Sequence, residues 1–295
     1  MHQLNVPIIV NGKENVSRET IYSVDDFPFS DFQTLRECRK RGKKKHSVIY
    51  YDVEMAFDIE TTTLEKLDYV RYNKTGEKVI KGDAFMYHWQ FCMKDTVCFG
   101  RTWNEFLLFC EKLHLYLQTS DYKRAVVYVH NLSYEFQFMK DFIEMDEIFA
   151  RDAHKVMKCF AYKYGIEFRC SYFLSNMSLA KYCENSEGVT HYKLTDTYDY
   201  RKIRTPSTPL TEVEQGYCYN DVRGLCECIR AARKEDNLSE IPLTSTGYVR
   251  REFRRAMQAD RSYYPDTFTD LALTLPQYRL CKDAFRGGNT HANRI

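Results

Sequence analysis

The sequence predicts an α/β fold in which helices flank a mixed β-sheet. Segments with the two-residue alternation of strands are interspersed with segments that repeat apolar residues at helical spacing. Two capping boxes, Thr102 with Glu105 and Thr211 with Glu214, mark the starts of two helices. Strands that alternate with helices along a chain are typical of a sheet with helices on its faces.

The residues before 48 are polar, so we expect an irregular extension there. It ends in a basic run from Arg36 to Lys45, in which seven of ten residues are cationic. Runs of this kind contact phosphate groups or act as localisation signals in some proteins, and in others they are merely solvated.

Regular elements are expected from residue 48 onward. After residue 244 we expect a smaller unit whose helix carries four arginines, Arg254 among them. We therefore divide the chain into residues 1–47, 48–235 and 236–295. The expected elements are strands at 48–60, 85–91 and 97–99, a helix at 102–117, a strand at 125–129, a helix at 133–142, a hairpin at 157–171, a loop at 204–209 and a helix from 211 to about 233.

Composition limits the class of protein. The net charge of +2 neither requires nor excludes a polyanionic partner, and 15% of the residues are aromatic. The 11 cysteines are scattered and odd in number, without a C-x-x-C pair, which indicates reduced thiols rather than a disulfide scaffold. Neither a secretory signal nor an apolar run of membrane-spanning length is present. We expect a soluble, cytoplasmic protein without a membrane partner.

Two copies of an Asp-x-Glu pattern lie on the first expected strand, Asp52-Val53-Glu54 and Asp58-Ile59-Glu60. Residues two apart on a strand share a face, so each copy can direct both carboxylates at one point. Such oxygen ligands suit Mg²⁺. The threonines that begin at Thr61 favour the second copy, because their hydroxyl and N–H groups can reach the end of a nucleic acid. The pattern is common, and by itself it does not identify a site.

A second motif follows the apolar strand at 125–129, at the edge where open α/β sheets place their sites. It reads His130-Asn131-Leu132-Ser133-Tyr134-Glu135, with Asn131 and Glu135 four positions apart on one face of the expected helix. Taken alone, an ordinary helix N-cap followed by an acid in the first turn explains this pair better than a site does.

A third motif, Tyr217-Cys218-Tyr219-Asn220-Asp221, lies inside the last long helix. Tyr217 and Asp221 are four positions apart and share a face of that helix. A half-buried tyrosine packed beside a solvated aspartate is the simpler explanation of the isolated pair.

The three motifs together follow the order found in the Asp-Glu-Asp-Asp exonucleases of the RNase H-like fold, in the subgroup with Tyr in the third motif. More closely, the sequence resembles the protein-primed family B DNA polymerases of small tailed phages and linear plasmids, over about residues 48–294. A fourth motif, Phe285-Arg286-Gly287-Gly288, is similar to the Tyr-x-Gly-Gly linker between the exonuclease and polymerase domains of that family.

The resemblance implies an exonuclease domain that proofreads DNA replication by hydrolysing the 3′-terminal phosphodiester of single-stranded DNA. It implies a monomer with two divalent cations, Mg²⁺ or Mn²⁺, about 4 Å apart, and with single-stranded 3′ ends, primer-template DNA and a terminal protein primer as partners. The implied catalytic residues and metal ligands are Asp58, Glu60, Glu135 and Asp221, with Tyr217 orienting the attacking water. The residues expected to bind DNA are Thr61, His130, Asn131, Tyr134, Phe138, Ser171, Arg254, Phe285, Arg286, Gly287 and Gly288, and Lys193 is a candidate for the lysine that precedes the third motif in the family.

Two positions depart from the family pattern. Glu135 stands where the family has Asp, which lengthens the side chain by one methylene, and Phe285 replaces the Tyr of the linker. The palm motifs of the polymerase family are absent from residues 1–295, so we expect an N-terminal fragment, a split gene product or a truncated frame that does not polymerise. A free-standing 3′–5′ exonuclease and a catalytically decayed module that binds single strands are the alternatives.

Overall fold

The computed structural model divides the chain into two compact units, Met1–Ser245 and Thr246–Ile295, which are described separately. The residues that the structure describes are 1–40, 47–72, 78–152, 154–194, 198–200, 202–234, 236–259 and 272–284.

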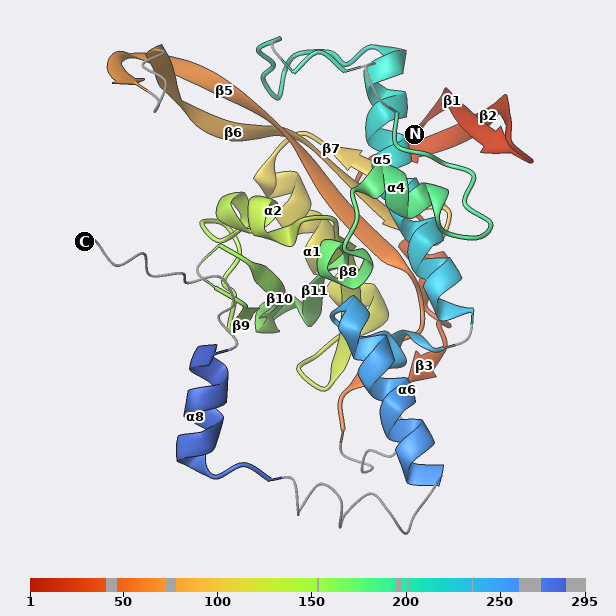
Figure 1. Cartoon of the computed structure of the whole chain (residues 1–295). Coiled ribbons are helices and arrows are strands. Elements are labelled where there is room, and N and C mark those ends of the chain that lie inside the picture. Colours follow the sequence, from red (N-terminus) through yellow and green to blue (C-terminus); the bar gives the residue numbers. More distant parts are fainter. Residues whose placement is uncertain are drawn as a thin grey trace. The chain divides into compact units, whose positions relative to one another are not determined.

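A mixed sheet forms the centre of the first unit, with its strands in the order β1-β2-β7-β6-β5-β8-β11-β10-β9 (Figure 1). The β5, β8 and β11 strands are parallel, whereas β6 and β7 continue from β5 as antiparallel neighbours. The strands are β1 (His2–Val10), β2 (Lys13–Tyr22), β3 (Glu37–Cys38), β4 (Ile49–Tyr51), β5 (Met55–Tyr72), β6 (Lys78–Met93), β7 (Thr96–Gly100), β8 (Lys123–Val129), β9 (Glu147–Ala150), β10 (Val156–Ala161) and β11 (Ile166–Cys170).

Both capping boxes predicted from the sequence are confirmed. Thr102 and Glu105 begin α1, and Thr211 and Glu214 begin α5. The helix expected at 133–142 begins at Leu132 and ends earlier than predicted, at Met139. The helices are α1 (Trp103–Leu117), α2 (Leu132–Met139), α3 (Ser171–Ser175), α4 (Leu179–Glu184), α5 (Glu212–Arg233), α6 (Ser245–Ala259) and α8 (Leu275–Ala284), with 3-10 turns η1 (Phe29–Phe32), η2 (Tyr162–Tyr164) and η3 (Leu238–Glu240).

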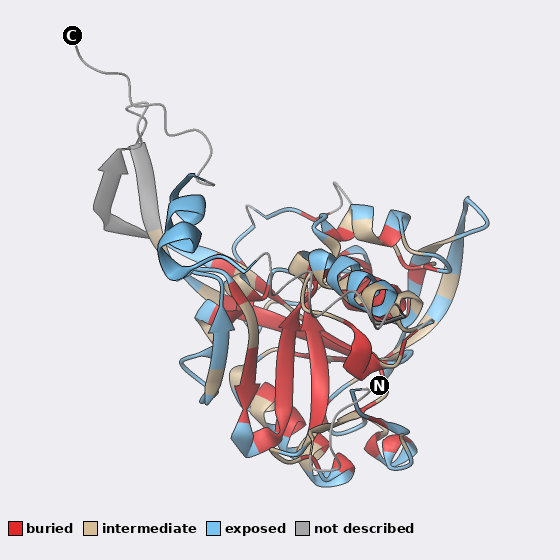
Figure 2. Cartoon of the chain, turned by 60° about the horizontal axis from the view of Figure 1, so that its bottom comes forward, coloured by how far each residue is buried: buried red, intermediate tan, exposed pale blue. Residues whose placement is uncertain are grey.

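Alternation along β5 gives the sheet two different faces. Phe57 and Ile59 point into the main hydrophobic core, where Phe57 stacks on Phe106 of α1 with 4.4 Å between ring centres. Because successive side chains of a strand point to opposite faces, Asp58 and Glu60 lie on the other face, and α5 packs against β5 and β6. The central strands are almost wholly buried (Figure 2), so carboxylates on the α5 face are held in a rigid, poorly hydrated place.

The prediction of an irregular extension before residue 48 is wrong for the first half of that segment. β1 and β2 form a regular hairpin, and β2 joins the sheet by parallel pairing with β7. The hairpin turns at Asn11 and Gly12, with φ of 52° and 72°. Asn-Gly is the dipeptide that favours this type of turn, so the sequence did contain the signal.

The strand expected at 48–60 is broken into β4 and β5 at Asp52–Glu54. The N–H of Asp52 donates to the carbonyl of Arg36, outside the sheet ladder. Its carboxylate accepts from the N–H of Leu238 at 2.9 Å and lies 3.2 Å from Arg233 Nε. Glu54 accepts from Arg230 Nε at 2.7 Å and from Arg233. This first Asp-x-Glu copy therefore anchors the C-terminal end of α5, and we refer to it as the α5 anchor.

The second unit contains α6 from its second residue, Thr246, onward and the whole of α8. Arg254 is exposed on α6, as are Arg250 and Arg255. None of the helices in the described ranges combines the length and the apolar character needed to cross a membrane.

Replacing Glu54 with Ala is expected to lower the free energy of unfolding by about 3 kcal/mol, because it leaves two arginines without their buried acceptor. Urea denaturation followed by circular dichroism measures the change. Glu144→Ala, at an exposed position, is the matched control and should shift stability by no more than about 0.5 kcal/mol. A Glu54→Ala protein as stable as the control would contradict the anchoring role.

Candidate metal centre

Asp58 and Glu60 point to the same side of β5, next to a strand irregularity. Asp58 lies opposite Gln90 of β6, and the Gln90 side-chain amide donates to Asp58 Oδ2 at 2.8 Å and to Glu60 Oε1 at 3.2 Å. The register between β5 and β6 then shifts. Glu60 pairs with His88 but Thr61 pairs with Met86, so β6 has one extra residue at this point. Such bulges commonly redirect side chains beside sites.

The third motif brings Asp221 to this pair. Asp221 on α5 is 2% exposed, and Tyr217, one turn earlier, is 3% exposed. Ligand oxygens of Asp58, Glu60 and Asp221 all lie within 4.8 Å of one another. Asp221 is therefore not a solvated surface residue. As the sequence predicts, the acid pair on β5 and the third motif on α5 form one cluster.

The second motif contributes Glu135 from the first turn of α2. Glu135 is 3% exposed, and its carboxyl group is close enough to Asp58 for that carboxylate to raise its pKa. Its Oε2 has no hydrogen-bond partner in the described part of the chain. Asn131 precedes α2 with φ 74° and ψ 47°, and its side chain makes no capping hydrogen bond. The motif is thus not an ordinary N-cap, and Asn is one of the few residues that tolerate this left-handed conformation.

Burial raises the pKa of each carboxyl in the cluster, and repulsion by neighbouring carboxylates further raises the pKa of Glu60, Glu135 and Asp221. Burial is the largest cause for all four groups. Asp58 further raises the pKa of Glu60 and Glu135, and the pKa of Asp221 is about 6. Asp221 Oδ1, like Glu135 Oε2, lacks a partner among the described residues. Closely spaced oxygens with unused lone pairs fit a hard divalent cation, which would offset this repulsion.

Lys193 is the cation that contacts the cluster. Its ammonium lies 2.5 Å from Asp221 Oδ2 and donates to the Tyr217 hydroxyl at 2.7 Å. Burial alone would lower the pKa of Lys193, but Asp221 and Asp58 raise it, so the ammonium stays charged. Its irregular spacing from the third motif made it a weak candidate in the sequence, and the structure places it in the cluster.

A close approach of two backbones positions Lys193. A Cβ on Gly224 of α5 would lie 2.2 Å from the carbonyl oxygen of His191. The His191 ring is tied to Glu227, one turn later on α5, by a 2.9 Å hydrogen bond. No side chain fits between these backbones, so Gly224 lets the segment that carries Lys193 lie directly on the helix.

Most of the residues expected to bind DNA gather around the carboxylates. The Thr61 and Tyr134 hydroxyls are 2.5 Å apart, and the Tyr134 and Phe138 ring centres are 5.2 Å apart. His130 Nδ1 lies 3.0 Å from Ser171 Oγ. A cavity of about 730 Å³ is lined by Asp58, His130, Asn131, Tyr172, Ser178, Leu179, Ala180, Lys193 and Asp221.

Other expected residues are not brought to this site. Arg254 belongs to the second unit, and Phe285, Arg286, Gly287 and Gly288 lie outside the described residues. Conversely, two residues beside the site, Gln90 and Tyr200, were not predicted from the sequence. Gln90 belongs to no recognisable motif, although it alternates with Trp89 and so lies on the sheet face that carries the acids. The Tyr200 hydroxyl lies 2.6 Å from the Tyr217 hydroxyl.

No protein-family model and no curated protein matches the chain. Phi29 DNA polymerase in a ternary complex with primer-template DNA and incoming nucleotide substrates matches with a TM-score of 0.52 at 14% identity, over 71% of this chain and 35% of that chain. The same polymerase complexed with single-stranded DNA matches with a TM-score of 0.52 at 14% identity, over 70% of this chain and 36% of that chain. This chain thus spans about a third of the polymerase's length. The likeness confirms the expected fold class.

The repulsion within the cluster leads to a test of cation binding. Asp221 keeps its proton to about pH 6 in the folded state, against 3.8 ordinarily. The folded protein therefore holds more protons than the unfolded chain in this window, and this group's contribution to stability falls as pH rises from about 4 to about 6. In chelator at pH 7.5, Glu60→Gln is expected to raise Tm by about 2–4 °C, because it removes one of the repelling charges.

Thermal unfolding with and without Mg²⁺ or Mn²⁺ completes this test. The cation should raise the Tm of the wild type and have a much smaller effect on Glu60→Gln, since binding to the folded state alone stabilises it. Equal responses of the two proteins to the cation would remove Glu60 from the set of ligands.

Proposed function

We propose that this chain is a metal-dependent 3′–5′ exonuclease that trims single-stranded DNA and that it forms part of a DNA-directed DNA polymerase. The observation that carries the proposal is the cluster of Asp58, Glu60 and Asp221, in which Glu60 and Asp221 are buried and Asp58 and Asp221 line an open cavity. The fold shared with part of Phi29 DNA polymerase, whose structures are described with primer-template and single-stranded DNA, supports it.

The carboxylates of Asp58, Glu60 and Asp221, with Glu135 beside them, would hold the cations, and we propose two, Mg²⁺ or Mn²⁺. Bound divalent cations activate water and neutralise charge on a phosphodiester. In the proposed reaction the oxygen of water bonds to phosphorus, the bond from phosphorus to the O3′ of the preceding nucleotide breaks, and that oxygen takes a proton. The products are a nucleoside 5′-monophosphate and a strand one nucleotide shorter.

Tyr217 and Lys193 suit the positioning of the attacking water. Burial, and then the nearby Asp221, raise the pKa of Tyr217, so its hydroxyl stays protonated and acts as a hydrogen-bonding group rather than as a base. Lys193 donates to that hydroxyl and fixes its orientation. Burial lowers the pKa of His130 to about 4, which keeps its ring neutral near pH 7 and able to accept a hydrogen bond.

The rim of the cavity suits an unpaired strand. The Tyr134 ring is 44% exposed beside Phe138 and can stack on a base. Thr61, His130, Asn131 and Ser171 supply hydrogen-bonding groups around it. Stacking on exposed rings needs unstacked bases, so we propose frayed 3′ ends as the substrate.

The place of this activity in replication is a further part of the proposal. We propose residues 48–235 as the trimming domain and residues 236–295 as a linker toward a polymerase palm, in a monomer of the cytoplasm. Primer-template DNA and a terminal protein primer are the proposed partners. Arg254 and the motif from Phe285 to Gly288 would then guide the strand by its phosphates.

Removal of one acid from the cluster tests the proposed activity. Asp58→Ala or Asp221→Ala should lower the rate of trimming of a labelled single strand by at least about a hundredfold, because each change removes a ligand for the cation. Asp52→Ala, in the α5 anchor, is the matched control and should retain trimming at a temperature where it remains folded. A wild type without cation-dependent trimming would leave only a single-strand-binding module.

Glu135 is tested by separating its charge from its length. Glu135→Gln should lower the trimming rate by about tenfold or more, because it keeps the size of the side chain and removes its charge. Glu135→Asp keeps the charge and should remain closer to the wild type than Glu135→Gln does. Rates measured at saturating cation decide the matter, and a Glu135→Gln enzyme with the wild-type rate would exclude Glu135 from the site.

A further inference from the structure

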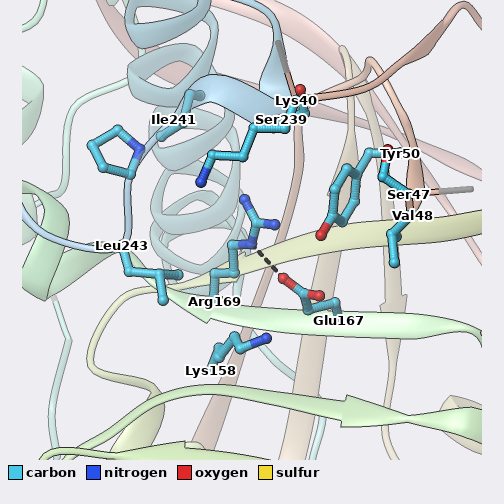
Figure 3. A pocket seen from close by; sticks show the side chains of 11 residues that line it. Lys40, Ser47, Val48, Tyr50, Lys158, Glu167, Arg169, Ser239, Ile241 and Leu243 are labelled. Carbon is cyan, nitrogen blue, oxygen red and sulfur yellow. Dashed lines mark hydrogen bonds and ion pairs between the residues drawn. The ribbon is translucent and has the colours of Figure 1, made fainter. Parts of the chain in front are cut away.

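A second cavity, of about 430 Å³, has no lining residue in common with the carboxylate cavity. Lys40, Ser47 and Tyr50 approach it from the segment before β5, and Lys158, Glu167 and Arg169 from the β10–β11 hairpin (Figure 3). Its volume falls within the range of small-molecule sites. Three cations and one carboxylate line it, so its charge is opposite to that of the carboxylate cluster.

Arg169 is the fixed element of this basic cavity. It is 6% exposed, and its Nε donates to Glu167 Oε1 at 2.7 Å. Arg124 Nη1 donates to the other oxygen of Glu167 at 3.0 Å and also lies 3.5 Å from Glu147, which does not line the cavity. Burial alone would raise the pKa of Glu167, but Arg169 and Lys158 lower it. The carboxylate therefore stays charged and holds the buried guanidinium in place.

The remaining polar groups of the basic cavity offer donors. In the part of the chain that the structure describes, neither Lys40 nor Lys158 forms an ion pair, and Ser47 Oγ has no hydrogen-bond partner. Lys40 belongs to the basic run at 36–45, which the carboxylate site does not use. The segment before β5, together with β10 and β11, thus directs donors into one cavity, and Glu167 is the one carboxylate among the described residues of its lining.

The walls of the cavity are partly apolar. The Tyr50 ring lies 5.0 Å from the Arg169 guanidinium, and Ile241, Pro242 and Leu243 form another side. An aromatic ring and aliphatic side chains can contact a sugar or a base, while the cations contact a phosphate. Arg169 projects from the same sheet face as Asp58, because Tyr128 pairs with both Arg169 and Ala56, and Ala56 is two residues before Asp58.

We propose that the basic cavity binds a phosphate group carried by a nucleotide or by a DNA strand, with Arg169, Lys158 and Lys40 as its contacts. A phosphate provides several acceptor oxygens for the donors that converge there, and a guanidinium matches its geometry. The proposal does not depend on the trimming reaction, because none of the cavity residues belongs to the carboxylate cluster.

The test is a binding titration of the full chain in chelator, so that no cation-mediated binding at the carboxylates contributes. The probes are inorganic phosphate, deoxyadenosine monophosphate and short oligothymidylate, followed by calorimetry and by the shift in Tm. Lys158→Glu and Lys40→Glu should each weaken binding by about tenfold or more, which corresponds to 1.4 kcal/mol. Lys13→Glu, the same charge change on the β1–β2 hairpin, should bind as the wild type does.

The three probes separate the sources of the phosphate. Equal affinity for phosphate and the monophosphate means that the cavity contacts the phosphate group alone. Tighter binding of the monophosphate assigns it to free nucleotides, and tighter binding of the oligonucleotide assigns it to the strand backbone. Circular dichroism and Tm without probe confirm that the variants are folded. The proposal is overturned if no probe binds the wild type, or if Lys13→Glu loses as much affinity as Lys158→Glu.

Discussion

Burial of several carboxylates against one lysine is the constraint on which this structure depends. Asp58, Glu60, Glu135 and Asp221 are desolvated together, and Lys193 is the cation that contacts them. Without a rigid fold around them, four carboxylates this close together would move apart or take up protons. The fold instead holds them in place, so the energy of their repulsion is available to favour a divalent cation. The proposed binding of a divalent cation would therefore be coupled to stability through these side chains.

The two Asp-x-Glu copies, one directly before β5 and one within it, have complementary roles. The first copy binds Arg230 and Arg233 at the C-terminal end of α5. The second copy faces Asp221, three turns earlier on that helix. Gly224 fixes the middle of the helix against the segment that carries Lys193. Because α5 is held at its C-terminal end and in its middle, the distance between Asp221 and the strand carboxylates does not depend on side-chain packing alone.

Local signals predicted the elements, and distant contacts decided the site. Both capping boxes act within four residues, so the sequence alone located the starts of α1 and α5. The threonines from Thr61 favoured the second acid pair, but the role of the first pair depends on Arg233, which lies 181 positions from Asp52. Lys193 and Gln90 reach the carboxylates through tertiary packing, for which no spacing rule exists. The left-handed Asn131 also escaped prediction, because a helix-capping Asn and a strained Asn look the same in one sequence.

Charge of both signs on one sheet face resolves a difficulty that the carboxylate cluster creates. A DNA strand carries negative charge, and buried carboxylates repel it until cations are bound. Lys193 cannot offset this repulsion, because its ammonium is already paired with Asp221. Attraction for a strand must then come from cations outside the cluster. Arg169, Lys158 and Lys40 are cations of this kind, since Glu167 is the one carboxylate among the described residues that line their cavity and it pairs with Arg169. Under the two proposals, separating the groups would let the acids bind metal ions while the bases bind phosphate, so that neither neutralises the other.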